Sequence, residues 1–193
     1  MNVYKIILSI LLVLPLVFTM HFVVSAHSAS SCDSGSESRG WKVHCSNSSN
    51  GHIGIYSFDF KYSPNLSSSY KNITNQGKSR WNTVGAVNIN YSSNSNNIVS
   101  QYSDPNTSTI AHVQSNTFNN HKTRWQLSYN DSKMDSRTDS KNIATSAHEF
   151  GHTIGLADLI QSSNEGKLMY GYSSRTVGYP QLSDITGAEE GVK

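Results

Sequence analysis

The chain has 193 residues, its formal net charge is +2 at pH 7, and only 15% of its residues are charged. This length is sufficient for one ordinary domain. The basic residues are scattered rather than clustered, which argues against a nucleic acid or an anionic membrane surface as a partner. Serine and asparagine are abundant, so neutral polar groups keep the surface soluble, a composition that suits an exported protein.

Residues 1–26 have the pattern of a secretory signal peptide. Lys5 precedes a mostly apolar run over residues 6–18, and residues 24–26 place small side chains at a cleavage site. An uncleaved membrane anchor is the alternative, because residues 22–24 lengthen the run toward the ~20 residues of a membrane span. We expect cleavage and secretion, with no stable membrane association afterwards, because three residues interrupt the run. They are Pro15, Thr19 and His21.

Residues 27–50 are rich in serine, asparagine and glycine, and we expect an irregular N-terminal segment there. This segment holds both cysteines of the chain, Cys32 and Cys45. In an oxidising compartment the two thiols can close a short loop, which would stabilise the fold by roughly 3 kcal/mol on the entropic model. A structural disulfide is therefore the expected state of this pair.

Hydrophobic periodicity in residues 51–193 predicts a single α+β domain. A long helix is expected from Leu66 to Val84, with Ser67 as its N-cap, because apolar residues recur there at three- and four-residue steps. Alternation of apolar and polar residues predicts short strands over residues 53–60, 86–91, 98–102, 109–114 and 123–129.

Two further helices complete the predicted fold. The first should begin near Asp139 or Ser140 and end at about Gly155, and the second should cover residues 182–190 with Ser183 as its cap. The expected architecture is a mixed, twisted sheet of four or five strands with an early long helix, a later helix, an irregular turn and a short C-terminal helix.

The helix expected from about residue 139 to Gly155 carries the residues with the clearest chemistry. His148 and His152 are four residues apart, so both imidazoles leave one face of the helix and can bind one zinc ion. Glu149 points to the side of the pair, where a carboxylate can reach a zinc-bound water. Gly155 allows the helix to stop and turn, which can bring Asp158 back as a third ligand. Three ligands with one open position are typical of a catalytic zinc site.

This pattern predicts a zinc-dependent endopeptidase that hydrolyses extended peptide or protein substrates and works as a monomer. Zinc would lower the pKa of its bound water toward ~7, and Glu149 would act as the general base and then protonate the departing nitrogen. One alternative is a catalytically silent peptide-binding module of the same fold, although such a module need not retain Glu149. Another is a non-proteolytic hydrolase.

A different third ligand is also conceivable. Asp158 could orient a histidine from outside the ligand set, with Glu189 or Glu190 completing the zinc site. We favour Asp158 as the ligand, because this alternative leaves the turn at Gly155 without a role.

Residues 148–158, followed by a turn around Met169, resemble the metzincin zinc endopeptidases, whose third zinc ligand is usually histidine. Asp158 at that position resembles the snapalysin-type bacterial members. The resemblance runs thinly over about residues 55–190 and implies a metzincin-like catalytic domain with an active-site helix and a Met-turn. Some stretches look closer to the matrixins, the catalytic domains of matrix metalloproteinases: residues 148–156, 168–172, 182–185 and 110–113.

The resemblance also carries implications for single residues. It places Met169 beneath the zinc without ligating it, and Tyr172 beside the pocket for the residue after the cut. His112 matches a matrixin ligand for a second zinc, but its partners are not evident, so an ordinary strand histidine is expected. The surroundings of Cys32 do not match the switch cysteine that keeps matrixins latent.

Calcium is a further ligand that some acidic loops bind. Asp131, Asp135 and Asp139 offer oxygen ligands, but they lack the order and the glycine of an EF-hand. The sequence therefore predicts one catalytic zinc ion and provides no clear calcium motif.

Overall fold

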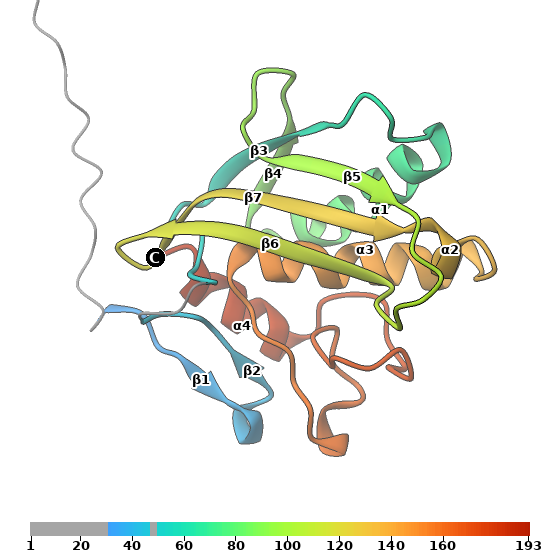
Figure 1. The fold of residues 1–193 in the computed structure, drawn as a ribbon. Helices are drawn as coiled ribbons and strands as arrows, with labels where there is room; N and C mark the ends of the chain where they lie inside the picture. The colour runs from blue at the N-terminus through green and yellow to red at the C-terminus, as the bar shows by residue number, and fades with distance from the viewer. Residues whose placement is uncertain (1–30, 47–49) are drawn as a thin grey trace, which may run out of the picture.

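The computed structural model describes residues 31–46 and 50–193 (Figure 1). The predicted signal peptide, residues 1–26, lies outside the described residues. Within the described ranges, no helix combines the length and the apolar character that crossing a bilayer requires.

A five-stranded sheet with the order β4-β3-β5-β7-β6 forms the upper part of the molecule in Figure 1. Neighbouring strands from β4 to β7 are parallel, whereas β6 runs antiparallel to β7 and forms one edge. The sheet is therefore mixed, and β6 is available for pairing along its outer side. The strands are β3 (Ser57–Tyr62), β4 (Asn88–Tyr91), β5 (Ile98–Tyr102), β6 (Ala111–Phe118) and β7 (His121–Asn130).

Helix α1 (Ser68–Val84) connects β3 to β4. Its N-cap is Ser67, whose hydroxyl accepts a hydrogen bond from Tyr70 N at 3.4 Å, as the sequence predicts. It ends at Gly85, which has a φ of 74°. Its buried residues form the expected stripe of Tyr70, Ile73, Thr74, Gly77 and Trp81.

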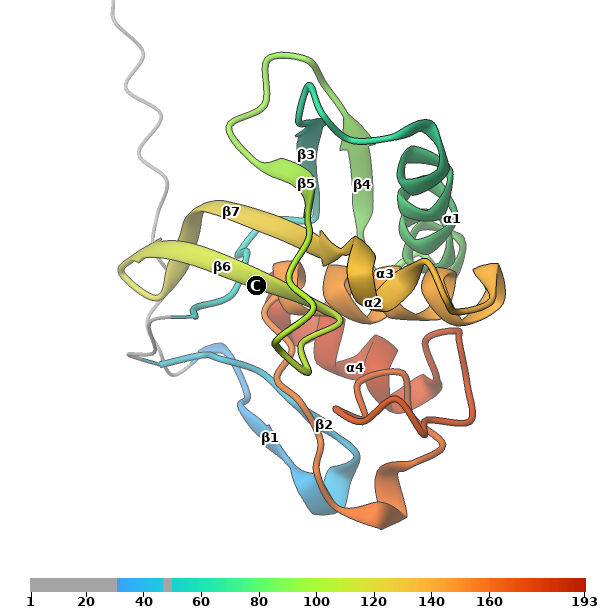
Figure 2. The same cartoon turned by 45° about the vertical axis from the view of Figure 1, so that its right-hand side comes forward.

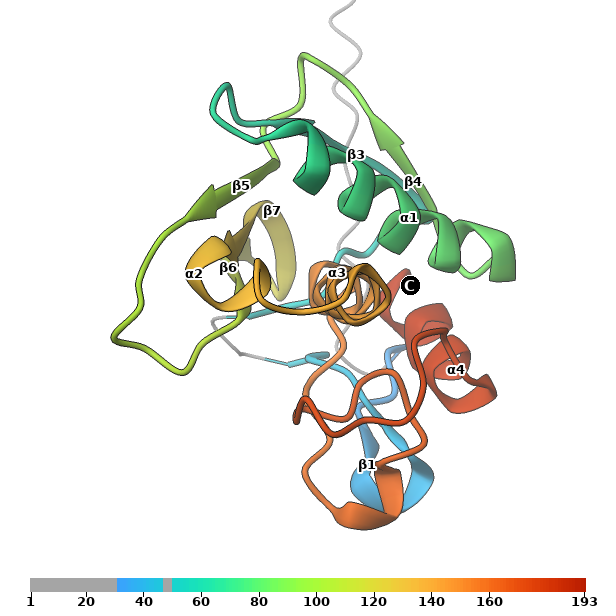
Figure 3. The same cartoon turned by 90° about the vertical axis from the view of Figure 1, so that its right-hand side faces the viewer.

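Helix α3 (Asp139–Ile154) lies on the same side of the sheet as α1 (Figure 3). Thr138 caps it, because its hydroxyl accepts from Lys141 N at 3.4 Å. The two helices approach closely at Gly77, where a Cβ atom would lie 2.3 Å from Ser146 Oγ. A side chain at position 77 would therefore push the two helices apart.

Aromatic side chains fix α3 against the sheet. The ring centroids of Phe60 and Phe150 are 5.7 Å apart, and those of Trp125 and Phe150 are 6.4 Å apart. All three side chains are at most 1% exposed. Burial of such rings contributes about 1.5–3 kcal/mol each, so α3 has a rigid backing.

The lower part of the molecule contains α4 (Leu182–Gly191), irregular loops and an N-terminal hairpin (Figure 2). The hairpin consists of β1 (Gly35–Ser36), the short 3-10 helix η2 (Glu37–Arg39) and β2 (Trp41–Lys42). Cys32 and Cys45 form the expected disulfide. The N-terminal segment is thus more regular than its composition predicts.

Several predicted boundaries differ from the observed ones. The strand expected over residues 53–60 begins only at Ser57, because Ile53 N donates to Ile154 O at 2.9 Å and Gly54 N donates to Gly191 O at 3.0 Å. Residues 53 and 54 therefore pair with helix ends rather than with the sheet. The cap of α4 is Gln181 and not Ser183, and the short helices α2 (Asp131–Met134) and η3 (Ser162–Asn164) were not anticipated.

Candidate metal centre

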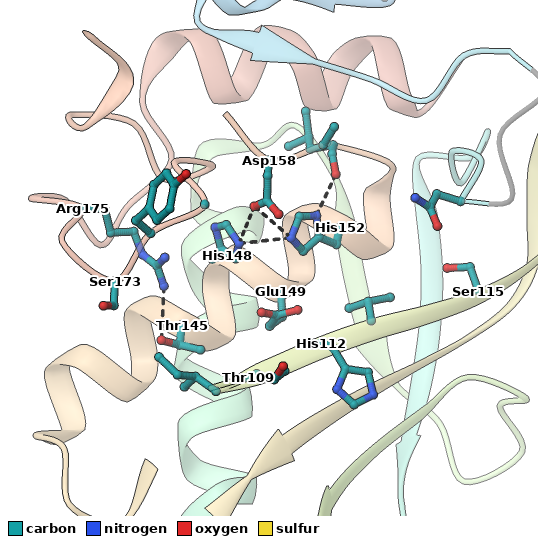
Figure 4. Close-up of a pocket in the computed structure, with 18 of the residues that line it drawn as sticks. Thr109, His112, Ser115, Thr145, His148, Glu149, His152, Asp158, Ser173 and Arg175 are labelled. Carbon is teal, nitrogen blue, oxygen red and sulfur yellow. Dashed lines mark hydrogen bonds and ion pairs between the residues drawn. The ribbon is translucent and has the colours of Figure 1, made fainter. Parts of the chain in front are cut away.

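Three potential ligand atoms converge at the C-terminal half of α3 (Figure 4). Nε2 of His148 lies 3.1 Å from Nε2 of His152 and 3.1 Å from Oδ1 of Asp158. Nε2 of His152 lies 3.5 Å from the same Asp158 oxygen. Among residues 31–46 and 50–193, these side chains form the one group of three whose donor atoms lie close enough to share a metal ion.

The spacing of these donors fits a small tetrahedral ion. With metal–donor distances of about 2.0–2.1 Å, the donors of a tetrahedral zinc site lie roughly 3.3–3.4 Å apart. The observed separations of 3.1, 3.1 and 3.5 Å bracket that value. Two imidazoles and one carboxylate are also ligand types that zinc accepts, so the residues present suit this metal.

Backbone carbonyls orient both imidazoles. Nδ1 of His148 lies 2.9 Å from Leu168 O, and Nδ1 of His152 lies 2.8 Å from Leu156 O. A carbonyl can only accept, so each Nδ1 carries a proton, and Nε2 is the nitrogen that a metal ion would bind in place of a proton. This tautomer is the one that metal ligation through Nε2 requires.

The electrostatics of the three donors favour positive charge between them. Burial opposes protonation of His152, but the hydrogen bond to Asp158 and the charge of Glu149 raise the pKa of His152 to about 9. Burial would raise the pKa of Asp158, yet hydrogen bonds from His148 and His152 hold it well below its usual range. A divalent cation would satisfy the same demand for positive charge.

Glu149 lies beside the ligand set without joining it. Its side chain faces the cleft next to the two imidazoles in Figure 4, and the residue is 5% exposed. Among the described residues, no donor reaches its buried Oε2 atom. A buried carboxylate oxygen without a hydrogen-bond partner is costly, so this atom can accept a hydrogen bond from a molecule in the cleft.

The turn at Gly155 places Asp158 beside the two histidines of α3. Gly155 ends α3 with a φ of 120°, and a Cβ atom there would lie 2.5 Å from His52 Cα. Beyond the turn, Ala157 N donates to Lys42 O at 2.9 Å. Hence the N-terminal hairpin holds the segment that carries Asp158.

Residues 155–172, which we call the ligand loop, are held by two carboxylates from distant parts of the chain. Glu37 accepts hydrogen bonds from Ile160 N at 3.0 Å and from Asn164 Nδ2 at 2.9 Å. Asp184, which is fully buried, accepts from Leu168 N at 3.0 Å and from Met169 N at 3.1 Å. Both ends of this irregular loop are thereby fixed.

Met169 packs against α3 at Gly151. A Cβ atom at Gly151 would lie 2.3 Å from Met169 Sδ, so the glycine between the two histidines makes room for the methionine. Met169 is 1% exposed. It therefore supports the helix at Gly151.

A cleft with a volume of about 750 Å³ opens in front of the three donors. One wall is α3 with the ligand loop and residues 171–175, and the other is residues 108–115, which include the start of β6. Tyr172 lines this cleft and is 54% exposed. The edge strand and the ligand atoms therefore face one another across a gap that a peptide chain can enter.

Other residues considered from the sequence do not join the three donors. His112 lies on the strand wall, with Nδ1 3.5 Å from the hydroxyl of Tyr102. Oε2 of Glu190 accepts from Asp33 N at 3.0 Å, which directs this side chain to the N-terminal segment.

The three aspartates considered for calcium also remain apart. Tyr70 donates to Asp135 at 2.8 Å and Gln101 donates to Asp131 at 3.2 Å. With Asp139, these carboxylates do not make up a second group of metal-ligand spacing among the described residues.

Three polar residues of the cleft were not predicted from the sequence. Thr145 lies one helical turn before His148, so helix periodicity would have placed it on the same face. Arg175 and Lys122 line opposite ends of the cleft, and nothing in the adjacent sequence distinguishes them from surface residues. Lys122 is 8% exposed, and burial lowers its pKa to about 7.

In comparisons with known proteins, the chain matches solved structures but no family model and no curated protein. Among the solved structures is a chain of the structure described as the GM1 bound form of the ECX AB5 holotoxin. That chain has a TM-score of 0.56 and 10% sequence identity, over 83% of this chain and 92% of its own length. At this identity the similarity concerns the fold alone.

These findings overturn the predicted membership of the metzincins, matrixin-like with a snapalysin-type aspartate. No family model supports it, and the similar solved chain belongs to an AB5 holotoxin. The physical reason is that residues 148–158 have the spacing that would bring three metal ligands together on a helix and the turn after it. Any fold that contains such a helix and turn can place three ligands in this way, so the motif describes a local geometry and not a family.

Proposed function

We propose that this chain is a secreted zinc-dependent endopeptidase. The observation that carries the proposal is the convergence of His148, His152 and Asp158 beside a buried Glu149 oxygen that lacks a hydrogen-bond partner among the described residues. When bound, zinc supplies a Lewis acid that polarises the scissile carbonyl and makes water a better nucleophile.

Glu149 is the proposed general base. It follows His148 directly, so its carboxylate projects to the side of the imidazole pair and into the cleft. There it can take the proton of an attacking water and return it to the leaving nitrogen. Its position outside the ligand set leaves both carboxylate oxygens available for this transfer.

An extended peptide is the proposed substrate. Strand β6 is the edge of the sheet, and residues 110–113 line the cleft opposite the ligand atoms. An unpaired strand edge offers backbone donors and acceptors to a peptide in the extended conformation. Such pairing would hold one peptide bond in front of Glu149.

Secretion fits the disulfide between Cys32 and Cys45, because such bonds persist in oxidising compartments. A charge of +2 without a basic cluster likewise gives no reason to invoke a nucleic acid as a partner.

The decisive experiment measures zinc content and casein cleavage in the exported protein and in two variants. Glu149→Gln should retain about one zinc per chain and lose about 10³–10⁴-fold in cleavage rate, because the proton acceptor is gone. Glu165→Gln removes a carboxylate outside the cleft and serves as the matched control.

The outcomes separate the alternatives. Chelator-sensitive cleavage that depends on Glu149 supports the peptidase. Zinc binding with peptide capture, but without cleavage, would instead identify the silent binding module. A wild-type protein that retains no zinc would overturn the proposal altogether.

A further inference from the structure

Arg175 introduces a positive charge into the cleft close to the ligand atoms. Its guanidinium donates to Thr145 Oγ1 at 3.2 Å and to Tyr170 O at 3.4 Å. In Figure 4, Arg175, Thr145 and Ser173 lie on one side of the two imidazoles, and Ser115 lies on the other. The guanidinium is therefore directed to one defined end of the cleft.

A second guanidinium reaches the same hydroxyl. Arg137 Nη1 donates to Thr145 Oγ1 at 3.1 Å, so two positive charges converge on one neutral oxygen. Neither arginine forms an ion pair with any residue in the described ranges. Burial lowers the pKa of both arginines, which reflects the cost of holding these charges away from water.

Arg175 keeps donors that the protein does not use. A guanidinium has five N–H groups, and contacts within the described residues engage two of those of Arg175. A planar group with free donors is well suited to a carboxylate, which it can bind in a bidentate manner. Since Arg175 lines the cleft, an occupant of the cleft can reach these donors.

The distance from the proposed reaction centre suits a neighbouring substrate residue. Thr145 precedes His148 and Glu149 by three and four positions, which corresponds to about 4.5–6 Å along the helix axis. Residues of an extended peptide are about 3.3–3.4 Å apart. The guanidinium therefore lies within reach of a side chain one or two residues from the cleaved bond.

The local balance of charge also favours an anion there. Two guanidinium groups meet at Thr145 at this end, the carboxylates that act on Arg175 are Glu149 and Asp158, and Asp158 is already paired with the histidines. Charge of one sign in a partly enclosed cleft attracts ligands of the opposite sign.

From these observations we infer that the Thr145 end of the cleft, with Arg175 as its specificity-determining residue, is a carboxylate-binding subsite. The inference rests on the proposed function for the identity of the occupant, a peptide. The carboxylate is either an aspartate or glutamate side chain next to the cleaved bond, or the terminal carboxylate of a short substrate.

The test begins with cleavage-site profiling on a peptide library, followed by quenched peptides that differ only in Glu or Gln at the preferred position. Wild type should cleave the Glu peptide about 10-fold faster in kcat/KM, the value expected for one charged hydrogen-bonded contact. Arg175→Gln should bring the ratio of the two rates close to one, and Arg175→Lys should retain part of the preference.

The ratio is measured within each variant, so a loss of stability cannot mimic the result. Arg124→Gln is the matched control, since Arg124 is exposed on β7 outside the cleft and its removal should leave the 10-fold ratio intact. A Glu preference that is unchanged in Arg175→Gln would overturn the subsite, and so would a wild type that prefers neither Glu over Gln nor a free over an amidated terminus.

A second peptide pair, ending at that position with a free or an amidated terminus, separates the two sources of the carboxylate. An Arg175-dependent preference for the free terminus supports the subsite with a terminal carboxylate as its occupant.

A binding measurement tests the subsite even if the protein does not cleave peptides. Fluorescein-labelled Glu and Gln peptides are titrated with wild type and Arg175→Gln, and anisotropy reports affinity. Absence of cleavage with a roughly 10-fold, Arg175-dependent preference for Glu would reject the peptidase and retain the subsite. Equal affinities would reject the subsite.

Discussion

The ligands of the candidate metal centre come from two regions that are built in different ways. His148 and His152 lie on α3, whose backbone hydrogen bonds and aromatic contacts hold them in a regular helix. Asp158 lies on the ligand loop, which is irregular apart from the short η3 and depends on Glu37 and Asp184 from outside it.

The difference teaches that one metal site can combine ligands from a rigid helix with a ligand from a loop that distant residues hold in place. The spacing of the helical pair follows from the geometry of any α-helix. The position of Asp158 depends on contacts between residues more than a hundred positions apart. Substitutions in the helix and in the loop should therefore fail in distinguishable ways.

The largest effect is expected when a helical ligand is removed. His152→Ala should lower zinc affinity by more than about 100-fold, because a donor held by a rigid element is lost. Asp158→Asn keeps an oxygen at the same place and should cost less, about 10–100-fold. Competition with a chromophoric chelator measures both, and equal losses would contradict the contrast between the helix and the loop.

Asp184→Asn should have the next largest effect, now on stability. The new amide presents N–H groups to backbone N–H donors, and at least one charged hydrogen bond is lost, at about 2–3 kcal/mol. Urea unfolding followed by tryptophan fluorescence gives the change. Glu189→Gln, exposed on the same helix, is the control and should change stability by less than about 0.5 kcal/mol.

Glu37→Gln should act mainly on zinc. The amide retains one acceptor but loses the charge that holds Ile160 N and Gln161 N, two and three residues after Asp158. We expect affinity for zinc to fall about 10-fold, as for other residues that orient a ligand. Asp33→Asn changes the same hairpin without contacting the ligand loop, and a similar loss there would refute a specific role for Glu37.

The smallest effect is expected across the cleft, at Lys122. Its pKa is about 7 in the fold, well below the usual ~10.4 of an unfolded lysine, so the unfolded chain binds more protons between these values. The contribution of Lys122 to the free energy of unfolding should therefore rise as pH increases from 7 to 10. Lys122→Met should abolish that rise without changing zinc affinity.

Urea unfolding at pH 7 and pH 9 checks this expectation, with the exposed Lys141→Met as control. A variant that keeps the full rise would show that other groups cause it. A change in zinc affinity would show that the strand wall also acts on the metal site.

Local patterns predicted those parts of the molecule that local forces determine. Periodicity placed α1 with its cap at Ser67, and the four-residue step of His148 and His152 anticipated donors on one face of α3. The glycine at position 155 indicated where the helix stops. Each of these depends on residues within a few positions of one another.

Long-range contacts account for what the sequence left out. The hydrogen bonds of Glu37, Asp184 and Arg175 join segments that the chain brings together only when folded, and such pairs have no periodic pattern. The family assignment failed for the opposite reason, since residues 148–158 satisfied a local requirement that many folds can meet.

The backbone pairing between Lys42 and Ala157 has a consequence for timing. These residues are separated by over a hundred positions, and contacts of such separation are slow to form. α3 can assemble from neighbouring residues, whereas Asp158 reaches its place only after both ends of the chain have met. A nascent or half-folded molecule would thus hold two donors without the third, and the proposed peptidase activity would arise last, when little unfolded chain of its own remains to be cut.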